Sequence, residues 1–171
     1  MLFGRSILSF LNGRFTRFGL GSGLKVDWVN YAIESVNSGL WVATGDGLNH
    51  RRDGVWTAYN GLSDDYVRAL ALDDLGRVWI GTTSGLDVFE NGKLRQVPTP
   101  GGELQHKIRA IACGRNQSLW LGTDAGVLRR ADGEWTFLTA TNGLTDQRVC
   151  ALSSDRDGNI WIGTRGDGST R

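Results

Sequence analysis

The chain has 171 residues, enough for one domain with its own core, and 19 basic and 18 acidic residues give it a formal net charge of +1. No basic run is long enough to follow a phosphate backbone, so we expect no nucleic acid partner. No segment approaches the ~20 apolar residues that span a bilayer, so we expect a soluble chain with no membrane segment or signal peptide.

The predicted elements fall into repeating units, and the many glycines (25 residues) predict tight turns between short strands. In chain order, we expect a half-unit over 1–28, complete units over 29–66, 67–107 and 108–148, and a half-unit over 149–171. Alternating apolar residues predict strands at 6–12 and 14–18, at 67–73, 77–82, 86–91 and 93–97, and at 149–155 and 159–164.

Two series of large side chains define the repeat. One is Trp41, Trp79, Trp120 and Trp161, separated by 38, 41 and 41 residues. The other is Phe15, Trp56, Leu94 and Trp135, separated by 41, 38 and 41 residues. A period near 40 that is rich in strand residues predicts an all-β propeller of four-stranded blades, with each tryptophan of the first series packed between neighbouring blades.

The two half-units complement each other, because the first supplies the last two strands of a blade and the second supplies the first two. Three arrangements remain open: a four-bladed ring from one chain, an eight-bladed ring from two chains, and a piece of a longer propeller. We favour the two-chain ring, which predicts a homodimer joined through the terminal strands.

Variable residues at the start of each blade's first strand predict a ligand site at one mouth of the central channel. They are Trp28, Asn30, Tyr66, Arg68, Lys107, Arg109 and Arg148. Aromatic faces stack on sugar rings and guanidinium groups bind carboxylates, so this set suits an acidic saccharide or another small anion. The alternative interpretation is that these side chains bridge neighbouring blades.

Catalysis finds little support in the sequence, and we expect no enzyme activity and no cofactor. The two histidines, His50 and His106, fall in different units, and no nucleophile motif or metal-ligand spacing accompanies them. The two cysteines, Cys113 and Cys150, occupy different positions of the repeat, so we expect free thiols rather than a disulfide.

The segments DDLGRVWIGTTSGLDVFENGK and DRDGNIWIGTRGDG resemble the two-component regulator propeller repeat. Two units depart from it: ESVNSGLWVATGDGL lacks the aspartate before the turn, and GRNQSLWLGTDAGVL lacks both that aspartate and the turn glycine. The resemblance implies a sensor-type, ligand-binding module like the extracytoplasmic parts of hybrid histidine kinases, often directed at sugar oligomers. It therefore also implies a periplasmic location.

Two alternative functions remain at this stage. One is a scaffold that binds protein partners through the loop face. The other follows from a weaker resemblance to streptogramin-inactivating lyases, whose propeller blades are also rich in Gly and Trp. Such an enzyme would need a histidine and metal-binding acids on one face, and His106 with Glu103 is the only candidate pair.

Overall fold

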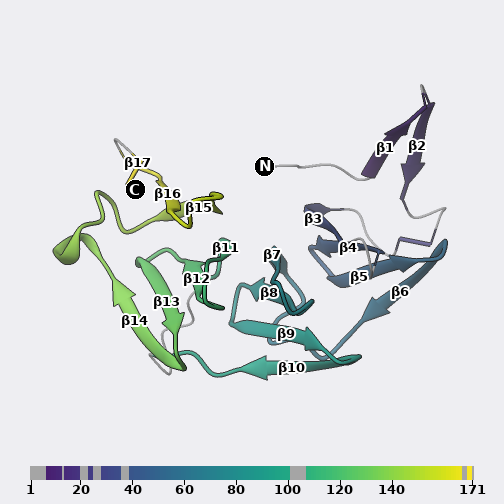
Figure 1. Cartoon of the computed structure of the whole chain (residues 1–171). Coiled ribbons are helices and arrows are strands. Elements are labelled where there is room, and N and C mark those ends of the chain that lie inside the picture. The colour runs from purple at the N-terminus through teal and green to yellow at the C-terminus, as the bar shows by residue number, and fades with distance from the viewer. Residues whose placement is uncertain are drawn as a thin grey trace.

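The computed structural model describes residues 7–12, 14–19, 23–24, 28–35, 39–100, 107–166 and 169–170. These residues form antiparallel sheets arranged side by side in an open arc (Figure 1). The all-β propeller fold predicted from the repeat is thereby confirmed. The one departure from strand and turn is a single 3-10 turn, η2 (Ala140–Asn142), within the described part of the chain.

Three sheets are complete blades of four strands in meander order. Blade 1 comprises β3 (Val29–Ser35), β4 (Gly39–Thr44), β5 (Gly47–Arg52) and β6 (Val55–Tyr59). Blade 2 comprises β7 (Val67–Leu72), β8 (Val78–Thr82), β9 (Leu86–Glu90) and β10 (Lys93–Val97). Blade 3 comprises β11 (Ala110–Cys113), β12 (Leu119–Gly122), β13 (Val127–Ala131) and β14 (Glu134–Leu138).

Incomplete sheets stand at the two ends of the arc (Figure 1). The N-terminal hairpin pairs β1 (Ile7–Leu11) with β2 (Arg14–Phe18), and the last sheet joins β15 (Val149–Ser154) to β16 (Ile160–Thr164). The sequence predicts only two strands for this last sheet, but a short third strand, β17 (Ser169–Thr170), also pairs with β16. We call β15, β16 and β17 blade 4.

The first strands of the blades lie along the inside of the arc, where β3, β7, β11 and β15 contact one another in chain order. The last two strands of each blade form an outer hairpin. In blade 2 its turn is Asn91-Gly92, with φ of 52° and 76°. Both residues are left-handed, as the tight turns that suit strand twist require, which explains why Asn-Gly or Asp-Gly recurs at this point of every unit.

The tryptophan of each second strand packs against the following blade, as predicted, wherever that blade is present. Trp41 and Trp79 are 1% and 3% exposed. Trp41 contacts Phe89 of blade 2 with ring centroids 4.8 Å apart. Trp161, at the end of the arc, is 44% exposed, so the prediction of burial fails for this member.

The glycine two residues after the tryptophan leaves room for the next blade. A Cβ atom at Gly81 would lie 2.4 Å from Ile108, and one at Gly122 would lie 2.5 Å from Val149. The threonine that follows closes the turn to the third strand. The Thr82 hydroxyl donates to the Gly85 carbonyl at 3.0 Å and accepts from the Gly85 amide at 3.0 Å. The Trp-Ile-Gly-Thr motif is therefore architectural.

Candidate functional site

A register shift marks the start of the first strand in three of the four blades. It falls between Val29 and Tyr31 in β3, between Val67 and Ala69 in β7, and between Val149 and Ala151 in β15. The residues outside the ladder are Asn30, Arg68 and Cys150. Such a bulge turns a side chain away from the alternating order of the strand, and bulges are common beside binding sites. Blades 1, 2 and 4 can thus each direct one residue toward the inside of the arc.

These residues line a cavity of about 310 Å³ on the inner side of the arc, which we call the central cavity. Its wall comes from the first strands β3, β7, β11 and β15 and from the residues just before them. The polar side chains among its lining residues are Asn30, Tyr31, Tyr66, Arg68, Arg109 and Cys150. Small and apolar residues such as Ala69 and Ile111 line the rest of the cavity.

Four of the seven predicted site residues line the central cavity: Asn30, Tyr66, Arg68 and Arg109. The other three, Trp28, Lys107 and Arg148, are not among its lining residues. Trp28 is half exposed and lies near Tyr66, since a methyl group at Gly45 would be 3.6 Å from each side chain. Arg148 instead forms an ion pair with Asp146 at 3.3 Å.

Arg68 and Tyr66 both line the cavity and contact each other. Its guanidinium carbon is 4.8 Å from the centroid of the Tyr66 ring, a distance at which a cation is attracted to an aromatic face. Its Nε atom is buried and has no hydrogen-bond partner among the described residues. The Nε atoms of Arg51 and Arg129 are buried and unpaired in the same way, so it is the position of Arg68 in the lining of the cavity that makes its guanidinium a candidate donor to a ligand.

Arg109 is held by Asp124, whose carboxylate accepts a hydrogen bond from Arg109 Nε. This bond is the main reason why the pKa of Asp124 is lowered, and the charges of Arg109, Lys107 and Arg68 lower it further. The same bond raises the pKa of Arg109. Arg68 and Arg109 thus bring two cationic groups to the cavity, and each interacts electrostatically with a carboxylate, Asp64 for Arg68 and Asp124 for Arg109.

Asp124 is the site residue that the sequence analysis missed. Its position in the turn between the second and third strands is typical of a solvated aspartate, and the corresponding residues are Gly45 and Thr83. A lone acidic residue in a turn that shares the mouth with three predicted basic residues was the available signal. Asn30 is partly structural, because its side-chain amide donates to the Val67 carbonyl at 2.7 Å.

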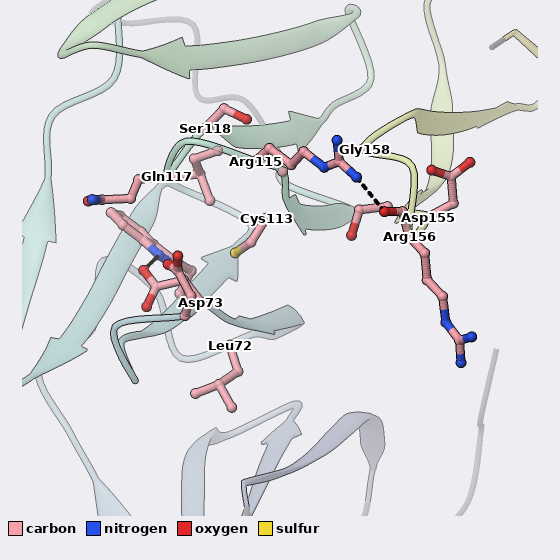
Figure 2. Close-up of a pocket in the computed structure, with 14 residues that line it drawn as sticks. Leu72, Asp73, Cys113, Arg115, Gln117, Ser118, Asp155, Arg156 and Gly158 are labelled. Carbon is pink, nitrogen blue, oxygen red and sulfur yellow. Dashed lines mark hydrogen bonds between the residues drawn. The ribbon is translucent and has the colours of Figure 1, made fainter.

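A second cavity, of about 350 Å³, lies among the turns between the first and second strands of blades 2, 3 and 4 (Figure 2). We call this connection the first turn of a blade. In blade 2 the Asp73 carboxylate accepts from the Leu75 and Arg77 amides, from Arg77 Nε at 2.6 Å and from the Trp79 indole at 2.8 Å. Asp155 makes the equivalent contacts in blade 4.

Blade 3 has Gly114 where its neighbours have aspartate, and the second cavity opens beside it. The Trp120 indole donates to Ser118 Oγ instead, at 3.3 Å. Arg115 reaches across to blade 4 and donates to the Arg156 carbonyl (Figure 2). Burial raises the pKa of the Cys113 thiol to about 12, which leaves it unreactive. Because Asp73 and Asp155 already accept several hydrogen bonds each, we assign these side chains to structure.

The histidine candidates do not form a catalytic centre in the described part of the chain. His50 is buried and stacks on Trp41 with ring centroids 3.9 Å apart and planes 10° from parallel. His106 and Glu103 lie outside the described residues. Among the residues that the structure covers, no three His, Cys, Asp or Glu side chains gather closely enough to hold a metal ion. Both cysteines are free, and Cys150 is exposed.

The family model described as "Two component regulator propeller" matches residues 61–84 and 143–166. These two segments are therefore similar to the two-component regulator propeller repeat. This finding confirms the resemblance noted in the sequence, and the matched segments include the cavity residues Tyr66 and Arg68. A comparison with curated proteins finds no match.

Solved structures agree with the propeller fold. The extracellular domain of a putative one component system from B. thetaiotaomicron is 21% identical with a TM-score of 0.82, and the match covers 96% of this chain and 25% of that one. The extracellular domain of a putative hybrid two component system from the same organism is 26% identical with a TM-score of 0.72, covering 82% of this chain and 20% of that one. This chain thus spans a quarter or less of their length.

A virginiamycin B lyase from Staphylococcus aureus is also similar, at 15% identity and a TM-score of 0.75. The match covers 98% of this chain and 62% of the lyase chain. Identity this low supports a shared fold and nothing about the reaction. No helix of the described residues is long and apolar enough to cross a membrane.

Proposed function

We propose that this propeller is a non-catalytic recognition module that binds an acidic saccharide, or another small anion, in the central cavity. The observation that carries the proposal is the convergence of Asn30, Tyr66, Arg68 and Arg109 on one cavity of about 310 Å³. A cavity of this size has room for a small ligand, and concave sites with a few convergent polar groups are the usual form of ligand sites.

The two arginines would contact the anionic group of the ligand. Both line the central cavity, and Asp124 holds Arg109 by accepting a hydrogen bond from its Nε. Guanidinium groups bind carboxylates through paired, charge-assisted hydrogen bonds. Tyr66, on whose ring the Arg68 guanidinium lies, also lines the cavity, and the nearby Trp28 is the other aromatic side chain predicted for this mouth.

The known relatives favour a sensor role and an extracytoplasmic location. The repeat belongs to two component regulators, and the similar solved structures are described as extracellular domains of one component and hybrid two component systems. We propose that the chain acts in the periplasm as a sensor-type module or part of one.

Calorimetric titration with uronic-acid oligosaccharides and their neutral analogues tests the proposed site. For a ligand that binds, Arg68→Ala and Arg109→Ala should each weaken binding by about 10- to 100-fold, the range for loss of a charge-assisted contact. The matched control is Arg95→Ala, which removes an exposed arginine from the outer strand β10 and should leave affinity unchanged. Wild-type affinity in both cavity variants would remove the central cavity from consideration.

A further inference from the structure

A buried carboxylate lies on the face that blade 2 turns toward blade 1, where Phe89 meets Trp41. This residue, Asp87 in β9, is 0% exposed. The same strand position holds the buried Asn49 in blade 1 and the buried Leu128 in blade 3. Burying a carboxylate is costly unless it is hydrogen-bonded or paired, and blade 3 does without one. Asp87 is therefore not required by the frame of a blade.

Asp87 holds the loop that joins blade 1 to blade 2, residues 61–66. The Ser63 hydroxyl donates to Asp87 Oδ1 at 2.9 Å, and the Ser63 amide donates to Oδ1 at 3.2 Å and to Oδ2 at 3.0 Å. Gly85 leaves room for this approach, because a Cβ atom there would lie 3.1 Å from Ser63 Oγ. Leu62 is buried in the cluster between the two blades. The loop is thus fixed to blade 2 near its middle.

The Asp87 carboxylate has no cationic partner among the described residues. Burial raises the pKa of Asp87, the amide and hydroxyl of Ser63 lower it, and no charged side chain contributes. The acidic groups of the loop are directed elsewhere: Asp64 accepts from the Ser84 hydroxyl at 2.7 Å, and Asp65 is exposed. Ser63 therefore supplies the hydrogen bonds that this buried carboxylate needs.

The loop leads directly into the proposed site. Tyr66 is its last residue and Arg68 follows in β7, and both line the central cavity in contact with each other. Asp64 accepts from the Tyr66 amide at 2.7 Å, so the loop turns there into the first strand of blade 2. A continuous series of contacts therefore joins the buried carboxylate to the wall of the cavity.

From these contacts we infer that Asp87 is a positioning residue of the central cavity, which holds the loop 61–66 so that Tyr66 and Arg68 are in place before a ligand arrives. The inference rests on the proposed function for the role of the cavity, but the contact of Asp87 with Ser63 is a property of the free protein. Asp87 is not among the residues that line the cavity, so it acts through the loop. Side chains set in place beforehand raise affinity because less freedom is lost on binding.

Hydrogen exchange of the full chain without ligand, followed by NMR, tests the contact. Asp87→Leu gives blade 2 the side chain found in blade 3, and it should speed exchange of the Ser63 amide by about 10-fold, as expected for loss of its hydrogen bonds. Exchange in β8 and β10 should stay at wild-type rates. Asp87→Asn should have a smaller effect, because its amide oxygen can still accept. The matched control is Asp65→Leu, which removes an exposed carboxylate from the same loop.

Urea unfolding separates positioning from a structural role. Removal of a carboxylate that stabilised the fold would lower the urea midpoint. We expect Asp87→Leu to leave the midpoint unchanged or to raise it, because an apolar side chain avoids the cost of burying a charge. The partly exposed Ser63 can then bond to water. A lower midpoint, unchanged exchange at Ser63, or equal acceleration throughout blade 2 would each overturn the inference.

Calorimetric titration adds the effect on the site. For a uronic-acid oligosaccharide that binds the wild type, Asp87→Leu should weaken binding by about 10-fold, the cost of ordering the loop side chains on binding. Ser63→Ala should weaken binding in the wild type but add nothing to Asp87→Leu, because the two residues act as one unit. Wild-type affinity in Asp87→Leu would also contradict the inference. If no such oligosaccharide binds, the proposed function fails, while hydrogen exchange still decides whether Asp87 holds the loop.

Discussion

The first turns of blades 2 and 3 differ in the group that accepts a hydrogen bond from the tryptophan indole. In blade 2 the Asp73 carboxylate accepts two backbone amides, an arginine Nε and the Trp79 indole. In blade 3, with Gly114 at that position, the Trp120 indole has only a weaker bond to Ser118. The contrast shows that the aspartate of the repeat orients the tryptophan that the next blade covers, and that its loss leaves a cavity.

The largest effect is expected from Asp73→Ala, which removes the carboxylate that accepts the hydrogen bonds in the first turn of blade 2. It leaves the buried Trp79 indole without its acceptor and removes the ion pair with Arg77 at 2.6 Å. An unpaired buried donor together with lost bonds to a charged group should lower the free energy of unfolding by about 3 kcal/mol. Urea unfolding measures this loss.

Asp74→Ala is the control for that experiment, because Asp74 is an exposed carboxylate on the same turn. Its effect should stay within about 0.5 kcal/mol, as for surface substitutions generally. Equal losses in the two variants would show that the turn depends on its net charge and not on the contacts of Asp73.

A smaller effect concerns pH and the corresponding aspartate of blade 4. Hydrogen bonds from the Asn159 side chain and then from Trp161 lower the pKa of Asp155 from 3.8 to about 2. Because the folded pKa is the lower one, the ionised carboxylate stabilises the fold above about pH 4, and this contribution is lost as pH falls through about 2. Urea midpoints between pH 5 and pH 2.5 should therefore fall less in Asp155→Asn than in the wild type.

The smallest expected effect is an increase in the free energy of unfolding from a substitution in the first turn of blade 3. Gln117 has φ of 57° and occupies the place that Gly76 has in blade 2, so its backbone is in the left-handed region that favours glycine. Gln117→Gly should raise the free energy of unfolding by about 0.5–1 kcal/mol. Asn116→Gly, at a neighbouring φ of 55°, should gain less because asparagine tolerates this region. Destabilisation by Gln117→Gly would show that the turn relies on that side chain.

The fold could be predicted because the same pattern of strands and turns recurs about every 40 residues. The spacing of Trp41, Trp79 and Trp120 fixed the strand that faces the next blade, and the Asn-Gly and Asp-Gly turns marked each outer hairpin. The strand β10 was predicted to the residue, while β17 was missed because two residues carry no alternating pattern. The exposure of Trp161 was missed because the motif is the same whether or not a blade follows it.

The candidate site was harder to predict than the fold. Alignment of the repeats placed Asn30, Tyr66, Arg68 and Arg109 near one mouth, and the structure brings these four together at the central cavity. It does not bring Arg148 there, because a local contact with Asp146 holds that side chain elsewhere. Asp124 was missed because an aspartate in a tight turn is typical of a solvated residue, and the sequence does not show that it pairs with Arg109. Ligand binding and the two-chain ring remain predictions.

The bulge at the start of the first strands also bears on how the sequence of a repeat protein can change by mutation. It exempts Asn30, Arg68 and Cys150 from the ladder that specifies their neighbours. A gene that grows by copying one module inherits the frame with every copy, yet blades 1, 2 and 4 each keep one position outside the hydrogen-bonded ladder. New molecular preferences can therefore arise by single changes at that position, with the cost of folding already met.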